Sequence, residues 1–325
     1  MGIYSDALQN QSNIQDRFEH SKRSLADVRT TFAELRGGQR PDVCVFAAGS
    51  LGRFETGRIS DLDVFIICDR KGRRIGERSI TKRATGELFK DLNVLIERLR
   101  LPPFSGYGKF LKVHELDDLI KATGDPRDDQ ENFFTTRLLL LLESQPISND
   151  PLYESAIQSV IENYFKDGKG RRDFQPLFLL NDILRYWRTL CLNYERDRAL
   201  EKPWWKRNLN LKFSRKLTVF STVLAIVSKQ LNDVDQFKEF SKKVPLERLA
   251  SVLDKIDDPN LASRFDDILC DYESFLAAKS YAELETKDQR TIDQFRLKAE
   301  KFGDFMYDAL HSKYLDRSLI KYLAV

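Results

Sequence analysis

An apolar run that ends in Gly49-Ser50 constrains the fold of this chain more than any other feature of its 325 residues. Residues 42–48 read Asp-Val-Cys-Val-Phe-Ala-Ala, which has the length and character of a short buried strand. Glycine then permits a sharp turn and a close approach of the backbone to a ligand. If a short helix starts there, its first N–H groups lack partners and can bind phosphate oxygens, with the Ser50 hydroxyl as a further donor. The pattern predicts a strand, a tight turn and a helix start that can hold a phosphate.

A pair of carboxylates opens a second apolar run, over residues 62–68. Side chains alternate between the two faces of a strand, so Asp61 and Asp63 should share one face while Leu62 points into the core. Two hard oxygen ligands on one face suit Mg²⁺ when triphosphate oxygens and water complete its shell. We therefore expect Asp61 and Asp63 to bind two Mg²⁺ ions, with Mn²⁺ as an alternative, and to support phosphoryl transfer with pyrophosphate as the leaving group.

Polar residues between the turn and the carboxylates complete the expected nucleotide site. Arg53 and Arg58 should lie near the same phosphates as charge-assisted donors. Ser60, which directly precedes the carboxylate pair, is assigned to the nucleotide site with Gly49, Ser50 and Arg53. A bare Asp-x-Asp or Gly-Ser is common, and it usually marks solvated carboxylates or a simple turn. The order strand, Gly-Ser, short spacer, Asp-x-Asp and second strand is much rarer, and it favours the functional interpretation.

The string Gly-Ser-Leu-Gly-Arg-x-Glu followed by Ser-Asp-Leu-Asp resembles the signature of the DNA polymerase β-like nucleotidyltransferase superfamily. It is most similar to the bacterial branch that contains the PII-protein uridylyltransferase and related nucleotidyltransferases, in which a helical domain follows the catalytic module. The strong match covers only residues 43–68, and residues 136–139 and 210–216 show weaker similarity. The resemblance implies a set of ligands: Asp61 and Asp63 for the metal, and Gly49, Ser50 and Arg53 for the triphosphate.

Members of this superfamily usually supply a third carboxylate from a later strand, and the sequence does not identify it here. Glu115, after an expected strand at residues 110–113, is a weak candidate, and the neighbouring His114 is weak evidence for a general base. The regulatory domains of the uridylyltransferase have no room in a chain of this length, so its particular substrate is not carried over. The hydroxyl acceptor is left open as a protein side chain, an RNA 3′ end, a small molecule or a second nucleotide.

The rest of the chain shows the apolar period of helices. Expected helices cover residues 12–36, 81–98, 133–143, 150–165, 178–194 and 211–231. Ser12 and Gln15 have the spacing of a capping box at the first of them. We predict an α+β fold in which a small mixed-sheet nucleotidyltransferase module precedes an α-helical bundle domain. The expected domains are an N-terminal amphipathic helix at 1–39, the catalytic module at 40–128, and a helical substrate-binding and closing domain at 129–325.

A basic patch in the helical domain is the other candidate for nucleotide contact. Lys212, Arg215 and Lys216 lie on one side of an expected helix, while apolar residues mark another side. A solvated face and a phosphate-binding face are equally good interpretations, and we assign Lys212 and Arg215 to the nucleotide site. The aromatic-basic stretch at 202–207 could stack bases, but packing between helices is the better interpretation.

Composition excludes several kinds of site. Lys and Arg outnumber Asp and Glu by 53 to 50, a net charge of +3 that is too weak to argue for nucleic acid. Four cysteines without a CxxC pair and three scattered histidines argue against a structural zinc site or a disulfide framework. The start of the sequence lacks the apolar core of a secretory signal, and no apolar run could span a bilayer. We expect a cytoplasmic protein with no membrane partner, and leave its oligomeric state open.

These features together predict a metal-dependent nucleotidyltransferase. It would transfer a nucleoside monophosphate from a nucleoside triphosphate to a hydroxyl acceptor and release pyrophosphate. The sequence does not choose the base, and ATP serves as the working substrate. The alternative from another class is a catalytically inactive nucleotide-binding sensor that signals through its helical domain, and a missing third carboxylate would favour it.

Overall fold

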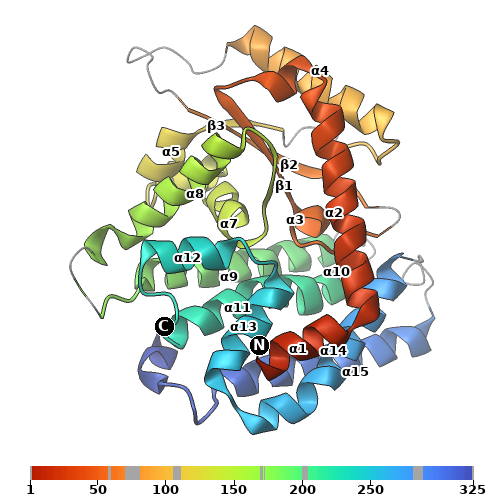
Figure 1. The fold of residues 1–325 in the computed structure, drawn as a ribbon, viewed down its shortest axis with the longest axis vertical. Coiled ribbons are helices and arrows are strands. Elements are labelled where there is room, and N and C mark those ends of the chain that lie inside the picture. The colour runs from red at the N-terminus through yellow and green to blue at the C-terminus, as the bar shows by residue number, and fades with distance from the viewer. Residues whose placement is uncertain are drawn as a thin grey trace. The chain divides into compact units, whose positions relative to one another are not determined.

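The fold was described from a computed structural model (Figure 1). It describes residues 2–57, 60–69, 81–104, 111–168, 171, 173–199, 204–280 and 288–323. The chain divides into two compact units: the sheet unit, Arg17–Asn163, and the helical unit, Met1–Asp16 with Tyr164–Val325. Most of the described elements are helices and the strands form one small mixed sheet, so the fold is of the expected α+β class.

The sheet unit is built on strands in the order β3-β2-β1-β4. Their bounds are Val43–Ala48 (β1), Asp63–Cys68 (β2), Val113–Glu115 (β3) and Gln145–Ser148 (β4). β1 runs antiparallel to both β2 and β4, whereas β3 runs parallel to β2. The strands expected at 42–48 and 62–68 are confirmed to within one residue. The third described strand begins at Val113, whereas the expectation was 110–113, of which residue 110 lies outside the described residues.

Helices cover both faces of this sheet (Figure 1). They are α2 (Ser12–Ala33), α3 (Gly49–Gly52), α4 (Lys82–Arg98), α5 (Leu116–Lys121), α6 (Arg127–Gln130), α7 (Phe133–Leu142) and α8 (Asp150–Phe165). A 3-10 turn at Arg36–Gln39 follows α2. The boundary between the two units falls inside α2 and inside α8.

One face of the sheet packs on α2 and α4. Alternate residues of β1 and β2, from Val43 and Leu62 onward, meet buried side chains of the two helices in one core. The apolar side chains expected to point inward from α4 are all buried, namely Leu88, Leu92, Leu95 and Ile96. Thr81 caps α4 by accepting a hydrogen bond from the Ala84 N–H at 3.2 Å. Because Leu62 lies in this core, the alternation along β2 directs Asp63 toward the opposite face.

The opposite face of the sheet is closed by α7 and α8. Phe46 of β1 and Phe65 of β2 stack with ring centroids 5.6 Å apart, and Tyr153 of α8 packs on Phe46. Arg137 of α7 is fully buried, and its guanidinium forms two 2.7 Å bonds with the carboxylate of Asp128. Such a bidentate, desolvated pair fixes the start of α7 against α6. The segment at 136–139, whose sequence is weakly similar to the family, therefore contains the arginine of a structural ion pair.

The helical unit contains the remaining helices. They are α1 (Ile3–Asn10), α9 (Leu177–Ala199), α10 (Trp204–Asn210), α11 (Lys216–Val227), α12 (Val234–Ser241), α13 (Pro245–Ile256), α14 (Pro259–Ser280) and α15 (Gln289–Leu310). A π-helical turn, η4 (Leu211–Arg215), joins α10 to α11, and 3-10 turns lie at Lys166–Gly168 and Arg317–Leu323. α11 is buried on nearly every side, which explains its almost wholly apolar sequence. No helix of the described ranges is long and apolar enough to cross a membrane.

The helix expected at 12–36 is confirmed as α2, which ends at Ala33, but the N-terminal segment contains a further helix, α1, that was not expected. The Gln15 side chain donates to the Leu8 carbonyl at 3.1 Å, which ties the end of α1 to α2. The expected domain boundary at 128/129 also differs from the observed one. α7 and β4 belong to the sheet unit, because β4 pairs with β1 and α7 covers the sheet.

Candidate functional site

The Gly49 turn and the Asp63 carboxylate lie directly side by side. β1 and β2 pair with Ala48 opposite Asp63, so the turn that follows β1 meets the start of β2. Gly49 has a φ of +65°, a conformation that residues other than glycine adopt only with strain. An ideal Cβ at Gly49 would lie 3.3 Å from Asp63 Cγ and less than 3.0 Å from Asp63 Oδ2. Glycine is therefore required at this position for two reasons: the backbone conformation and the close approach of the carboxylate.

The side chains of residues 61–63 alternate between the surface and the core, as the sequence predicts. Leu62 is 4 % exposed and lies in the core, whereas Asp61 and Asp63 are both exposed. β2 begins at Asp63, so Asp61 lies just before the strand. The two carboxylates line the same cavity of the sheet unit, as oxygen ligands for a shared cation would have to do.

This cavity has a volume of about 480 Å³ and opens beside β2 and β3. Its acidic lining residues are Asp61, Asp63, Asp129 and Glu131, and its apolar ones are Leu62, Val64, Phe65, Phe104 and Leu111. Lys112 forms an ion pair with Glu131, and that hydrogen bond lowers the pKa of the Glu131 carboxyl. A volume of this size is typical of sites for small ligands.

His114 lies in the wall of the cavity, on the same sheet face as Asp63. It pairs with Ile67 across the parallel β2–β3 ladder, is 3 % exposed, and packs edge-on against Phe133 of α7. Burial, together with a smaller effect of the positive charge of Lys112, lowers the pKa of His114 to about 4. The imidazole is therefore neutral at physiological pH.

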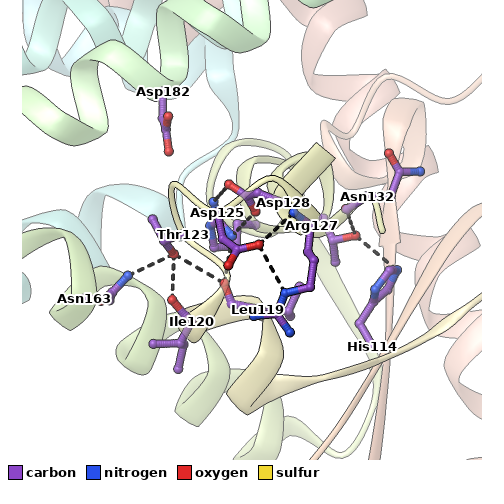
Figure 2. Close-up of polar contacts among 12 residues, drawn as sticks. His114, Leu119, Ile120, Thr123, Asp125, Arg127, Asp128, Asn132, Asn163 and Asp182 are labelled. Carbon is purple, nitrogen blue, oxygen red and sulfur yellow. Dashed lines mark hydrogen bonds and ion pairs between the residues drawn. The ribbon is translucent and has the colours of Figure 1, made fainter. Parts of the chain in front are cut away.

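The tautomer of His114 follows from its neighbours (Figure 2). The Thr136 hydroxyl donates its single proton to the Asn132 carbonyl at 2.9 Å, so toward His114 it can only accept. His114 Nε2 lies 3.3 Å from that hydroxyl oxygen, and this arrangement favours the tautomer with the proton on Nε2. His114 Nδ1 is then an acceptor, and it is buried without a hydrogen-bond partner among the described residues. A buried nitrogen in this state is costly unless something else donates to it.

Arg53 is buried rather than exposed toward a ligand. Its Nε donates to Glu55 at 2.8 Å and its Nη1 donates to Glu143 at 2.6 Å, and all three side chains are at most 4 % exposed. Gly52, one residue earlier, allows the Glu143 carbonyl to approach more closely than a Cβ would permit. These contacts tie the end of the Gly-Ser turn to the segment that leads into β4. They favour a structural role for Arg53 over the expected contact with phosphate.

The serines of the predicted site have different surroundings. Ser60 Oγ accepts a hydrogen bond from the Gly57 N–H at 2.9 Å, which closes the loop before the carboxylate pair. Ser50 is partly buried in α3, and its carbonyl accepts from the Glu55 N–H at 2.8 Å. Arg58 lies outside the described residues. The phosphate contact of Ser50 Oγ stays a prediction, while Ser60 Oγ already accepts a hydrogen bond from Gly57.

The candidate for a third carboxylate does not lie beside the pair. The parallel ladder places Glu115 opposite Cys68, five residues beyond Asp63, which corresponds to roughly 16 Å along a strand. In the described parts of the chain, no three Asp, Glu, His or Cys side chains are grouped to hold a metal ion. Asp61 and Asp63 fit Mg²⁺ as a pair of exposed oxygen ligands at a cavity, with phosphate and water oxygens left to complete its shell.

The basic patch belongs to the helical unit, so it is described apart from the carboxylates. Lys212 and Arg215 lie within η4, Lys216 opens α11, and all three side chains are partly buried. Burial lowers the pKa of the Lys216 amine, and the charge of Lys212 adds to this effect. Phe213 and Leu217 point into the core, which confirms the expected division of this helix into a basic and an apolar side.

Two residues of the site carry no clear signal in the sequence. Glu143 lies in the predicted helix 133–143, and nothing in its spacing indicates an ion pair with Arg53. His114 stands beside Glu115 in the sequence, but its place in the wall of the cavity depends on the β2–β3 register.

No protein-family model matches the chain, and no curated protein matches it either. The geometry of the turn, the carboxylates and the cavity is therefore what supports a functional interpretation.

Proposed function

We propose that this protein is a metal-dependent nucleotidyltransferase that transfers a nucleoside monophosphate from a nucleoside triphosphate to a hydroxyl group. The observation that carries this proposal is the contact between the Gly49 turn and the Asp63 carboxylate. The turn can present backbone N–H groups to phosphate, and the carboxylate can bind Mg²⁺. These two functions support each other only if both groups face the same metal-bound phosphate.

In this proposal each group of the site has one task. Asp61 and Asp63 would hold Mg²⁺, which supplies charge neutralisation at the triphosphate when bound. The backbone at Gly49 and the Ser50 hydroxyl orient the triphosphate. The acceptor oxygen forms a bond to the α-phosphorus, the bond from that phosphorus to the bridging oxygen breaks, pyrophosphate leaves, and the hydroxyl proton passes to water. Arg53 positions the turn through its ion pairs with Glu55 and Glu143.

Pyrophosphate release from Asp61→Asn and Asp63→Asn variants tests this proposal. Both substitutions keep the shape of the side chain and remove its charge, so triphosphate turnover with Mg²⁺ should be abolished. Asp117→Asn is a matched control, because Asp117 is exposed on α5 and pairs with Lys121 away from the cavity. Thermal melts should agree among the three variants. Turnover near the wild-type rate in both site variants would contradict the proposal.

The same assay separates a transferase from a nucleotide sensor. Titration of the wild-type protein with the common nucleoside triphosphates, with and without Mg²⁺, measures binding. Metal-dependent binding without pyrophosphate release, over a wide range of added hydroxyl acceptors, would favour the sensor. Release that depends on both Mg²⁺ and an acceptor would favour the transferase.

A further inference from the structure

A serine interrupts the buried apolar stripe of α2. Phe18, Leu25, Val28 and Phe32 recur at helical spacing along this helix and are all buried. Ser21 occupies the stripe position between Phe18 and Leu25, and it is fully buried as well. A hydroxyl at such a position costs free energy unless it forms hydrogen bonds. The partners of Ser21 therefore indicate why an apolar residue is replaced here.

The partner of Ser21 is Thr56, which lies in the loop between the Gly49 turn and the carboxylate pair. Ser21 Oγ accepts a hydrogen bond from the Thr56 N–H at 3.1 Å, and it lies 2.7 Å from Thr56 Oγ1. Arg17, one turn earlier on α2, donates from Nη1 to the Thr56 carbonyl at 3.3 Å. The N–H, the hydroxyl and the carbonyl of Thr56 are thus all bonded to α2. We call this set of contacts, formed by Arg17, Ser21 and Thr56, the Thr56 clamp.

The Thr56 clamp is connected to the carboxylates by one hydrogen bond. Gly57 follows Thr56, and its N–H donates to Ser60 Oγ at 2.9 Å. Ser60 directly precedes Asp61 in the sequence. Residues 58 and 59 lie outside the described residues, so the connection is argued from the Gly57–Ser60 bond alone. A displacement of Thr56 would pass through that bond to Asp61.

The other end of the loop is joined to the Gly49 turn. The N–H of Glu55 donates to the Ser50 carbonyl at 2.8 Å, directly before Thr56. Thr56 therefore lies between a segment bonded to the turn and a segment that leads to Asp61. Fixing Thr56 fixes the separation between the two parts of the proposed site.

α2 is a firm support for this loop. Its apolar stripe packs in the core against β1, β2 and α4. Arg29 of α2 also donates to the Pro146 carbonyl of β4 at 2.9 Å and forms an ion pair with Asp150 at 2.7 Å. The clamp therefore ties a surface loop to a helix that is itself held at several points of the sheet unit.

We propose that Ser21 and Arg17 are positioning residues of the metal site, which hold through Thr56 the loop that places Asp61 where it can share a cation with Asp63. This inference rests on the proposed transferase function and adds α2 to the residues that serve its site. Neither positioning residue contacts the metal. Residues that orient metal ligands typically contribute 10–100-fold to metal affinity.

Titration with Mn²⁺ in place of Mg²⁺, followed by electron paramagnetic resonance without triphosphate, measures the metal affinity. Ser21→Ala removes both bonds to Ser21 and should weaken Mn²⁺ binding about tenfold or more. Thr56→Val keeps the shape and the N–H of Thr56 but lacks the hydroxyl, so its loss should be smaller. Thr56→Ser keeps the hydroxyl and should bind Mn²⁺ like the wild-type protein.

Two variants on the same helix separate positioning from general stability. Val28→Ala removes buried apolar contact far from the loop, so it should lower Tm and leave Mn²⁺ affinity unchanged. Ser24→Ala removes a hydroxyl that donates only to the His20 carbonyl of its own helix, at 3.0 Å, and should change neither quantity. Each titration is run well below the Tm of the variant.

Amide hydrogen exchange tests the loop directly, without metal or nucleotide. NMR on protein labelled with ¹⁵N-glycine follows the Gly57 amide, whose acceptor Ser60 Oγ is present in every variant described so far. Ser21→Ala should accelerate exchange at Gly57 severalfold, because the residue before it is no longer held. Val28→Ala should accelerate Gly57 no more than it accelerates Gly86 of α4.

A double variant tests the route through Ser60. Ser60→Ala removes the hydrogen bond from Gly57 and should weaken Mn²⁺ binding as well. Because both serines lie on one route, Ser21→Ala combined with Ser60→Ala should bind Mn²⁺ about as weakly as the weaker single variant. Full addition of the two losses would contradict this route.

The possible failures are distinguishable. Wild-type Mn²⁺ affinity in Ser21→Ala, an equal loss in Val28→Ala, or unchanged exchange at Gly57 would overturn this inference and leave the transferase proposal standing. Absence of Mn²⁺ binding in the wild-type protein would overturn the metal assignment and this inference together. A protein that passes the Mn²⁺ and exchange tests but releases no pyrophosphate would contradict the transferase alone.

Discussion

Replacing Gly49 by alanine should abolish most of the activity while costing little stability. A left-handed conformation costs a residue other than glycine about 1–2 kcal/mol, which corresponds to a fall in Tm of roughly 2–8 °C. The new Cβ would also meet Asp63 Oδ2, which must move by roughly 1 Å to regain ordinary contact distance. A displacement of that size at a reacting centre can lower turnover about 100-fold. The expected outcome is a modest loss of Tm and a large loss of Mg²⁺-dependent pyrophosphate release.

Two other glycines provide matched controls for this substitution. Gly124 has a φ of +83° with open space around a built Cβ, so Gly124→Ala carries the backbone strain without the clash. Gly86 lies within α4 with open space as well, and Gly86→Ala should raise stability by about 0.5–1 kcal/mol. If Gly49→Ala and Gly124→Ala reduce turnover equally, or if Gly49→Ala retains wild-type turnover, the contact between Gly49 and Asp63 is not part of the site.

Three further outcomes follow from the contacts described above. Arg53→Met should lower the free energy of unfolding by about 3–5 kcal/mol in urea, because it leaves Glu143 buried without its cation; a loss below about 1 kcal/mol would contradict the ion-pair assignment. The pKa of His114 is about 4 when folded and higher when unfolded, so the unfolded chain binds the extra proton between pH 4 and 6.5. Stability should therefore fall as pH drops through that window, by on the order of 3 kcal/mol, and this slope should flatten in His114→Phe; an unchanged slope would refute the shift. Reversing Lys212 and Arg215 to Glu should weaken triphosphate binding without changing the circular-dichroism melt, and unchanged affinity and turnover would identify a solvated face.

The local pattern was sufficient to predict the elements that carry the site. Alternation along residues 61–68 predicts that Leu62 enters the core, and the structure confirms it because the α2 and α4 core needs apolar residues at every second position of β2. The helix at 81–98 was equally predictable, since its cap and its apolar stripe are both local features.

Features that depend on pairing between distant segments were not predictable in this way. β4 is four residues long and contains Pro146, so its sequence gives little indication of a strand, and its pairing with β1 joins residues about 100 positions apart. The burial of Arg53 has the same origin, because its partner Glu143 lies just before that strand. From its sequence alone, an arginine three residues after the Gly49-Ser50 turn looks like a phosphate ligand, because the segment that carries its buried partner Glu143 is 90 residues further along the chain.

The late position of β4 has a consequence for how this protein is made. β1 lies between β2 and β4, so until residue 148 leaves the ribosome one of its edges has no hydrogen-bonding partner. An apolar strand with an open edge is prone to pair with other chains, and nascent chains expose such edges while synthesis continues. A fragment that ends at residue 128 would keep the Gly-Ser turn and both aspartates yet leave that edge open permanently. We expect it to aggregate, whereas a fragment that extends through α8 retains the partner strand.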